Sequence, residues 1–430
     1  MSPRQLLIDA FHAAVAAVQA ETVMPPHLPE PLTKPGTERL IVVGAGKAAA
    51  AMAACVEAQL PEADLSGLVI TRHGHGLPTR RIEVVEAGHP LPDAAGLDAA
   101  QRLLAQVRSA APDDRVLALI SGGGSSLLSL PVAGISLPEL QAVSAALLNS
   151  GAPIAEINTV RKHLSQTLGG HLATACRAPV TALLISDVAG DDPAVIASGP
   201  FAPDASTFTD ALAILARRSI SAPESVQRHL AAGAAGESEE TPKPGTACFT
   251  RVEQRVIANG RTALLAAADF FQAQGIRPVV LGDTFSGEAR EVAQAFAGLV
   301  REIRAHGNPW PTPVVLLSGG ETTVTVENPV RGKSRGGRNA EFALALAITL
   351  NGLAGVYALA ADTDGIDGTE GNAGAVIAPD TLARAGLFNV DARSHLADHD
   401  AYGFFAPLGD LVMTGPTRTN VNDFRAILVL

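Results

Sequence analysis

Short apolar segments alternate with longer segments of helical periodicity along most of this chain, and this alternation limits the folds that the chain can adopt. In the first half, the apolar segments cover residues 39–43, 67–70, 82–85, 115–120 and 180–185. They lack the two-residue alternation of a strand with one wet face, so we expect strands that are buried on both faces. Alternating strands and helices are typical of an α/β protein with a doubly wound parallel sheet and helices on both faces.

The alternation is interrupted once, over residues 233–247, and this interruption indicates two domains. Gly, Pro and acidic residues dominate this segment, which predicts an exposed connector. Beyond it the pattern resumes, with helices expected at 261–274, 286–305 and 339–350 and strands at 276–281, 313–317 and 354–360. We therefore predict a larger Rossmann-like domain over residues 1–232, a linker over 233–248 and a smaller α/β domain over 249–430.

The composition excludes several classes of protein. Hydrophobic residues make up 47% of the chain and charged residues 17%, which excludes an intrinsically disordered protein. The net charge is −11 without a long basic run, so nucleic acids and anionic membranes are poor candidates as partners. No apolar stretch reaches the roughly 18 residues of a membrane helix, and the three cysteines form no C-x-x-C pair. We therefore expect a cytoplasmic protein.

Ligands of open α/β sheets bind beyond the carboxyl ends of the strands, and four predicted loops in that position carry unusual residues. In the first loop, Gly44 and Gly46 let the backbone approach an anion, and Lys47 adds a positive charge at the start of the following helix. The two glycines partly match a dinucleotide-binding fingerprint. A tight turn with a solvated lysine would give the same pattern.

The second loop is a run of glycines flanked by serines: Ser121, Gly122, Gly123, Gly124, Ser125 and Ser126. Successive glycines can form a nest of backbone N–H groups that binds an anion. A serine hydrolase is the competing interpretation, but the G-x-S-x-G elbow is incomplete because Leu127 stands at its last glycine position. The sequence therefore favours an anion-binding loop.

The third loop carries Asp187 and Asp191 after a predicted strand. Carboxylate oxygens are ligands that Mg²⁺ prefers beside the phosphates of a substrate. This loop therefore predicts a magnesium site, with a solvated turn of aspartates and glycines as the alternative.

The fourth loop region is composite. Residues 318–321 precede a basic, glycine-rich segment at 332–339 and a run of aspartates at 362–368. Arg338 is expected at the N-terminus of a helix, where it can meet phosphate oxygens through two parallel hydrogen bonds. Neither segment completes a standard motif, since Glu327 stands where a P-loop needs its first glycine and the aspartate run lacks the EF-hand ligand pattern.

Two further segments offer candidates for binding a substrate. His73 lies in a loop that could line a substrate site or form a plain turn. Arg161 and Lys162 lie with Asn158 near the start of a helix predicted over residues 156–175, where they could hold a carboxylate or phosphate or simply be solvated. Anion-binding loops, aspartate loops and isolated cations together indicate phosphoryl transfer, in which positioning and charge neutralisation provide the catalysis.

Eight motifs at these loops are highly specific when taken together: Val43-Gly-Ala-Gly-Lys47-Ala, Ile120-Ser-Gly-Gly-Gly-Ser-Ser126, Asn158-Thr-Val-Arg161-Lys162-His163-Leu-Ser165, Ser186-Asp187 with Gly190-Asp191, Ser198-Gly199-Pro200, Gly336-Gly337-Arg338-Asn339, Asp362-Thr-Asp364-Gly-Ile-Asp367-Gly368, and Thr414-Gly-Pro416 with Thr419-Asn420-Val-Asn422-Asp423. Through them nearly the whole chain resembles the glycerate 2-kinase family that has a C-terminal MOFRL domain. Some members of that family are labelled hydroxypyruvate reductase.

The resemblance implies ATP-dependent phosphorylation of (R)-glycerate to 2-phosphoglycerate with Mg²⁺, in an active site between the two domains. It also implies catalytic importance for Lys47, Arg338 and Asp364. Lys47 and Arg338 would neutralise charge on the transferred phosphoryl group. Asp364 would orient or deprotonate the substrate hydroxyl, or bind Mg²⁺, and the sequence does not decide between these roles.

The remaining candidate residues fall into three groups. Those expected to bind the nucleotide are Gly44, Gly46, Ser121, Gly122, Gly123, Gly124, Ser125, Ser126 and Gly337. Those expected to bind D-glycerate are His73, Arg161, Lys162 and Asn339. Those expected to bind Mg²⁺ are Asp187, Asp191 and Asp362. The expected partners are the two small molecules, ATP and D-glycerate, and a homo-oligomer is left open.

Three positions depart from the family pattern. Leu168 stands where the family usually has lysine, Arg418 where glycine is expected, and Ala340 where glutamine is frequent. The first two departures change the charge beside the expected cleft.

Two other functions are compatible with the same residues. The Gly44-x-Gly46 loop suits an NAD(P)H-dependent hydroxypyruvate reductase, in which Glu62 or Asp64 would bind the ribose. A non-catalytic regulator would bind a sugar phosphate or nucleotide without turnover. The aspartates at strand ends argue against such a regulator, because a simple anion binder gains nothing from negative charge unless a metal is present.

Overall fold

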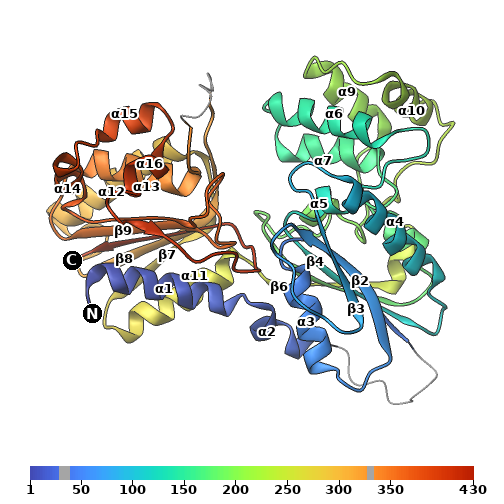
Figure 1. Ribbon diagram of the computed structural model, residues 1–430, viewed down its shortest axis with the longest axis horizontal. Coiled ribbons are helices and arrows are strands. Elements are labelled where there is room, and N and C mark those ends of the chain that lie inside the picture. Colours follow the sequence, from blue (N-terminus) through green and yellow to red (C-terminus); the bar gives the residue numbers. More distant parts are fainter. Residues whose placement is uncertain (29–38, 327–333) are drawn as a thin grey trace. The chain divides into compact units, whose positions relative to one another are not determined.

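The computed structural model describes residues 1–28, 39–326 and 334–430. These residues form two compact units (Figure 1). Ala20–Ile257 form the parallel-sheet unit, and Met1–Gln19 together with Ala258–Leu430 form the mixed-sheet unit. Gly332 and Lys333 of the predicted basic loop lie outside the described residues.

The parallel-sheet unit is built on a six-stranded sheet with the strand order β3-β2-β1-β4-β5-β6. Its strands are β1 (Leu40–Ala45), β2 (Leu65–Arg72), β3 (Ile82–Ala87), β4 (Arg115–Ser121), β5 (Val180–Ile185) and β6 (Val252–Ala258). The neighbouring strands from β3 to β5 run parallel. The strand order reverses between β1 and β4, the position where doubly wound sheets bind ligands. The predicted Rossmann-like sheet is therefore confirmed.

The helices of this unit form layers on the sheet and beyond it. α3 (Ala49–Gln59) connects β1 to β2 in one direction and α4 (Ala94–Ser109) connects β3 to β4 in the other, so right-handed crossovers put them on opposite faces. A further layer consists of α6 (Leu137–Asn149), α7 (Ile154–His163), α9 (Phe208–Arg217) and α10 (Glu224–Ala234), which share an apolar core of their own. Short helices complete the unit: α2 (Ala20–Val23), η1 (Pro25–His27), α5 (Gly124–Leu127), α8 (His171–Ala175), η2 (Ile196–Ser198) and η3 (Ala247–Arg251).

The single helix predicted over residues 156–175 is two helices in the structure. α7 ends at His163, and α8 begins at His171. Between them Gly169 and Gly170 have φ angles of 59° and 87°, which a right-handed helix cannot contain. The apolar spacing continues across the gap, so the prediction was wrong because it gave too little weight to two consecutive glycines.

The mixed-sheet unit is built on a second six-stranded sheet, with the strand order β11-β10-β9-β12-β8-β7. Its strands are β7 (Arg277–Glu288), β8 (Val314–Thr323), β9 (Val356–Asp362), β10 (Gly374–Ile377), β11 (Leu411–Val412) and β12 (Asp423–Val429). β7 and β8 are parallel, and the other neighbouring strands are antiparallel. Because β12 lies between β8 and β9, its first residue Asp423 pairs with Gly320 on one side and with Asp362 on the other.

Helices cover both faces of the mixed sheet. α1 (Pro3–Ala17) and α11 (Gly260–Ala273) lie side by side on one face, and α12 (Ala289–His306) and α13 (Arg338–Leu350) cover the other (Figure 1). α14 (Thr381–Leu387), α15 (Ala392–Ala397) and α16 (Ala401–Phe405) pack against α13. None of the helices in the described parts of the chain combines the length and apolarity needed to cross a membrane.

The two units divide the chain differently from the predicted boundaries. The first helix, assigned to the domain over 1–232, belongs to the mixed-sheet unit, where Phe11 is buried with its ring 5.6 Å from that of Phe424. The predicted linker over 233–248 lies within the parallel-sheet unit, where Thr241 is buried. Apolar spacing identifies an amphipathic helix but does not reveal which sheet that helix covers.

Candidate active site

The glycine loop after β1 and the serine–glycine loop after β4 meet where the strand order reverses. Lys47 N–H donates to the Gly122 carbonyl over 2.9 Å, and Ala48 N–H donates to Ser121 Oγ over 3.0 Å. At Gly46, whose φ is 136°, a Cβ atom would lie 2.1 Å from the same Oγ atom. The close approach of the two loops therefore requires glycine at this position.

The serine–glycine loop continues with a turn that has a lysine and a histidine beside it. Gly123 is left-handed, with φ of 83°. A Cβ atom on this residue would lie 3.0 Å from the His89 ring and 3.5 Å from Lys47 Cγ. Lys47 and His89 therefore flank the same backbone, and a lysine beside successive glycine N–H groups suits a bound anion.

Three polar side chains form a hydrogen-bonded chain that starts from this loop. Ser125 Oγ lies 2.7 Å from Ser198 Oγ, and the Ser198 hydroxyl donates to Asn158 Oδ1 over 2.9 Å. Ser198 and its neighbour Ala197 are buried and have φ angles of 58° and 50°. Each such conformation in a non-glycine residue costs of order 1–3 kcal/mol. Backbone strain beside this buried series of hydrogen-bonded side chains supports a functional role for the segment.

Two predicted substrate-binding cations follow Asn158 on α7, and their environments differ. Lys162 is buried, and its Nζ lies 3.4 Å from the Asp204 carboxylate. Arg161 is partly buried and has no carboxylate partner among the described residues, and burial lowers its pKa. Because an unpaired charge is costly to bury, a bound anion would stabilise Arg161.

His73, which is also predicted to bind the substrate, is held by a carboxylate near the surface. Its Nε2 lies 2.9 Å from Asp93 Oδ2, and 60% of the His73 side chain is exposed. Asp93 also accepts from the Gly96 N–H over 2.9 Å at the start of α4. An exposed pair of this kind is weak, so the His73 ring stays accessible to a ligand.

The predicted magnesium ligands Asp187 and Asp191 lie in the loop after β5. Both are partly buried, and Asp191 has a φ of 55°. Within residues 1–28, 39–326 and 334–430, no three or more His, Cys, Asp or Glu side chains form a group able to hold a metal ion. Mg²⁺ at a phosphate site needs only one or two carboxylates besides water and phosphate oxygens. The donor set of this loop therefore fits a phosphate-bound magnesium ion.

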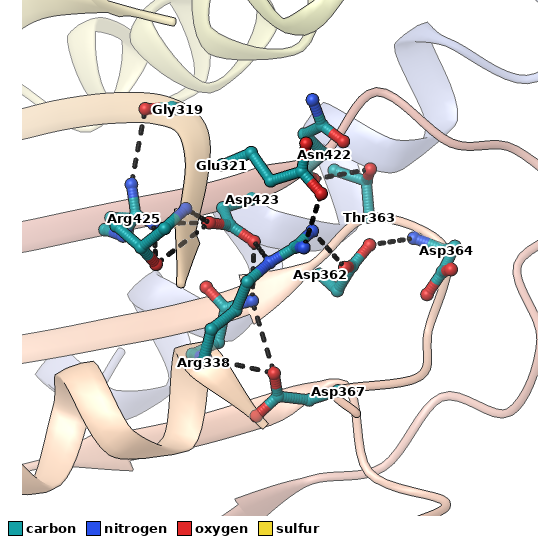
Figure 2. A network of polar contacts seen from close by, with 12 residues as sticks. Gly319, Glu321, Arg338, Asp362, Thr363, Asp364, Asp367, Asn422, Asp423 and Arg425 are labelled. Atoms are coloured by element: carbon teal, nitrogen blue, oxygen red, sulfur yellow. Dashed lines mark hydrogen bonds and ion pairs between the residues drawn. The ribbon is translucent and has the colours of Figure 1, made fainter. Parts of the chain in front are cut away.

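In the mixed-sheet unit, Arg338 is the centre of a network of ion pairs (Figure 2). It is the first residue of α13, and its nitrogens reach three carboxylates, with Nε 2.6 Å from Asp423, Nη1 2.7 Å from Glu321 and Nη2 2.9 Å from Asp362. The carboxylates converge because β8 and β9 end beside the start of β12. Burial opposes the charge of an arginine, but these carboxylates raise the pKa of Arg338 well above its usual value.

Asp423 anchors this network from inside the protein. Its carboxylate is fully buried and accepts from Arg338, from Arg425 and from Asn339 Nδ2, the last over 2.8 Å. Burial would raise the pKa of Asp423, but the charges of Arg338 and Arg425 lower it. Asn339, predicted to bind the substrate, is itself buried and faces Asp423.

The aspartates that follow β9 play different parts. Asp367 accepts from the N–H groups of Asn339 (3.0 Å) and Ala340 (2.8 Å) at the start of α13, and burial raises its pKa to about 6. Asp364 is buried, and its N–H donates to Asp362 Oδ1 over 3.0 Å. Figure 2 shows Asp362 between Asp364 and the guanidinium. The predicted acid–base residue is therefore next to the network but not in its centre.

Comparisons with known proteins cover both units. A family described as a domain of unknown function (DUF4147) matches residues 6–231, and the MOFRL family matches residues 314–423. The D-glycerate 2-kinase of Thermotoga maritima is 39% identical to this chain, over 98% of the chain and 97% of that protein. The chain belongs to the glycerate kinase family.

Further members of the glycerate kinase family agree in sequence and in structure. A crystal structure of the glycerate kinase from Thermotoga maritima matches with a TM-score of 0.86 at 38% identity and covers 99% of each chain. A protein of Agrobacterium vitis that is provisionally named hydroxypyruvate reductase is 50% identical, over 100% of this chain and 95% of that protein. The family resemblance seen in the sequence is confirmed, together with the α/β fold and the MOFRL domain.

Within this glycerate kinase fold, two of the three departures from the family pattern are buried. Leu168 contributes to the apolar core of the parallel-sheet unit, and Ala340 is buried in α13. Arg418 has a φ of 60°, the left-handed region that favours glycine. Leu168 therefore adds no charge at its position, and Arg418 adopts a strained backbone where the family pattern expects glycine.

The structure brings the predicted residues together in two groups, one in each unit. The first contains the glycine loop, the serine–glycine loop and Asn158. In this group Gly44 is in close contact with Leu119, and Ser126 Oγ donates to the Gly123 carbonyl over 3.2 Å. The second contains Arg338, Asp362 and Gly337, where a Cβ atom would lie 2.4 Å from Asp367.

Sequence reasoning did not assign a role to several residues of these two groups: Ser198, His89, Glu321, Asp423 and Arg425. Signals for three of them were present, because Ser198 and Glu321 follow predicted strands and Asp423 closes one of the family motifs. His89 and Arg425 carried no local signal, since a lone histidine or arginine has no pattern of its own.

Proposed function

We propose that this protein transfers the γ-phosphoryl group of ATP to the 2-hydroxyl of (R)-glycerate and so forms 2-phosphoglycerate. The observation that carries the proposal is the similarity to relatives named D-glycerate 2-kinase and glycerate 2-kinase, at 39% and 40% identity. The hydroxyl oxygen bonds to the γ-phosphorus, and the bond from this phosphorus to the bridging oxygen of ADP breaks. The proton of the hydroxyl is released in the same step.

Phosphoryl transfer depends on positioning and on neutralising charge, and the cations of this chain supply both. We assign Lys47 and the serine–glycine loop to the phosphates of ATP. Arg161 is assigned to the carboxylate of glycerate, because a partly buried guanidinium without a carboxylate partner among the described residues suits such an anion.

Residues of the mixed-sheet unit complete the proposed chemistry. Arg338 stabilises charge on the transferred phosphoryl group, and its buried carboxylate partners hold the guanidinium in one orientation. Asp364 orients the substrate hydroxyl or accepts its proton. The proposal therefore draws on residues of both units.

Mg²⁺ belongs to the proposal because an ATP triphosphate carries charge that two or three protein cations do not balance. Asp187 and Asp191 would hold it through carboxylate oxygens, and the bound ion would neutralise phosphate charge. Asp362, the third predicted ligand, also accepts a hydrogen bond from Arg338, so a metal ion bound there would share this carboxylate with the guanidinium.

A direct assay tests the proposed activity. Purified protein is incubated with ATP, Mg²⁺ and D-glycerate, and 2-phosphoglycerate is resolved from 3-phosphoglycerate. We expect ADP and 2-phosphoglycerate in equal amounts. No ADP above background with any of a panel of small hydroxy acids would reject the kinase, and 3-phosphoglycerate as the product would reject the site of transfer.

The second candidate is an NAD(P)H-dependent hydroxypyruvate reductase, because the Agrobacterium vitis relative carries that name. Its support from geometry is weak. Glu62 and Asp64 precede β2, so they lie at the edge of the parallel sheet opposite the glycine loop, whereas a ribose-binding acid should follow that strand. Oxidation of NADH or NADPH on addition of hydroxypyruvate, without ATP, would favour the reductase.

A further inference from the structure

The three carboxylates around Arg338 differ sharply in exposure. The side chains of Asp423 and Asp362 are 0% and 8% exposed, whereas that of Glu321 is 57% exposed. Asp423 is also held by Arg425 and Asn339. Among the residues that the structure describes, the Glu321 carboxylate has no partner other than Arg338.

These differences in exposure separate the buried partners of the Arg338 guanidinium, which are fixed, from the exposed partner Glu321, which can be replaced. Releasing Arg338 from Asp423 would break an ion pair whose carboxylate is fully buried, which is strongly unfavourable. Releasing it from Glu321 costs little, because water solvates an exposed carboxylate that leaves an ion pair. The Nη1 atom is therefore the donor of Arg338 that an incoming ligand can reach at the lowest cost.

We infer that Glu321 is a displaceable partner of Arg338, and that an anion of the phosphate class takes its place at Nη1 when it binds. The inference deepens the proposed function, on which it rests for the choice of a phosphate ligand. Displacement also lowers the negative charge that the ligand meets, because the guanidinium otherwise faces three carboxylates. Glu321 would thus tune affinity for the phosphoryl group without contributing to its transfer.

The test measures anion binding without turnover. Inorganic tripolyphosphate is titrated calorimetrically, at constant pH, Mg²⁺ and ionic strength, into the wild type and Glu321→Gln. We expect about two- to fivefold tighter binding to the variant, since exposed ion pairs contribute up to roughly fivefold to an equilibrium constant. Asp380→Asn is the matched control, because it removes one exposed carboxylate that pairs with Arg384 at 3.3 Å in the same unit, and it should leave the affinity unchanged.

The dependence on Arg338 is checked by repeating the Glu321→Gln substitution in an Arg338→Ala background, where the gain should vanish. Unchanged or weaker binding to Glu321→Gln would overturn the inference. The same gain in Asp380→Asn or in the Arg338→Ala background, or no measurable binding to any variant, would also overturn it.

Turnover of D-glycerate in the same preparations separates this inference from the proposed function. Normal turnover with no change in tripolyphosphate affinity would reject the displaceable partner alone. A change in affinity without formation of phosphoglycerate would reject the proposed reaction alone.

Discussion

The loops of the parallel-sheet unit and the network around Arg338 handle charge in opposite ways. The loops are made largely of backbone, with glycines packed against neighbouring strands and Lys47 as a cation, while Arg161 lies on α7. The network is dense in charge, and its guanidinium nitrogens already bind carboxylates of the protein. We propose that the first region binds a ligand through backbone N–H groups, whereas in the second region the protein's own carboxylates hold the arginine in place. A cation at the start of a helix therefore does not reveal which of these two tasks it has.

The largest effect is expected from Asp423→Ala, which tests whether the network is held from inside. Arg338 and Arg425 would lose their shared buried partner, and breaking a buried ion pair costs about 3–5 kcal/mol. Urea denaturation should show a loss of unfolding free energy of this size. Asp380→Ala, which breaks an exposed pair at 3.3 Å from Arg384, is the control and should cost less than about 1 kcal/mol. Equal losses would show that Asp423 is not an anchor.

The next effect compares the two regions in catalysis. Lys47→Ala and Arg338→Ala should each lower kcat more than tenfold, or by about 1.4 kcal/mol and more in activation free energy, because each removes charge stabilisation from the transition state. Steady-state kinetics with ATP and D-glycerate provide the measurement. Arg335→Ala, which loses an exposed pair with Glu370 at 3.0 Å, should change kcat by less than about twofold.

These kinetics can contradict the assignment of one catalytic cation to each unit in two ways. A fall in kcat for only one of the two alanine variants would place the catalytic charge in one unit. Unchanged kcat in both variants would reject both role assignments.

A third effect, on stability and not on catalysis, should show that the first region depends on its backbone. Gly46→Ala places a Cβ atom 2.1 Å from Ser121 Oγ at a φ of 136°, so it combines overpacking with strain. Gly190→Ala also falls on a positive φ, 86°, but has no atom within 4 Å of the added Cβ. We expect Gly46→Ala to lower the unfolding free energy by about 2–3 kcal/mol more than Gly190→Ala. Similar thermal denaturation of both variants would contradict close packing at Gly46.

The smallest effect is a pH dependence from the second region. Burial raises the pKa of Asp367 to about 6 in the folded protein, against roughly 3.9 in an unfolded chain. The folded state therefore binds this proton more tightly, and stability falls as the pH rises from about 4 to about 6, by on the order of 1–2 kcal/mol. Urea denaturation should show that the unfolding free energy of Asp367→Asn rises relative to that of the wild type as the pH increases across this window. A constant difference between pH 4 and pH 7 would show that Asp367 does not titrate there.

Much of the fold and half of the site could be predicted because their signals are local. A strand followed by glycines and a helix identifies both loops of the parallel-sheet unit, and the rule for doubly wound sheets places them side by side. Arg338 and Asp362 are predicted as candidates in the same way, from a helix start and a strand end. These assignments need only the order of elements along the chain.

The rest depends on contacts that no local pattern reports. Asp423 reaches Arg338 because β12 enters the sheet between β8 and β9, and neither apolar spacing nor turn residues specify that insertion. The first helix covers the mixed sheet for the same kind of reason, since its buried Phe11 would suit either sheet. Asn339 illustrates the same limit, because its place at a helix start suggests a ligand contact but does not reveal that its amide donates to the buried Asp423.

The position of β12 also orders events during synthesis of the chain. Residues 20–257 form one contiguous unit, so all of its strands leave the ribosome before the mixed sheet can close. The mixed-sheet unit instead joins the first helix to strands made much later, and β12 completes the centre of its sheet. Until β12 emerges, Arg338 has no Asp423 and the first helix has no finished sheet to cover. The arginine network is therefore assembled last, and an interrupted chain would carry the glycine loops without it.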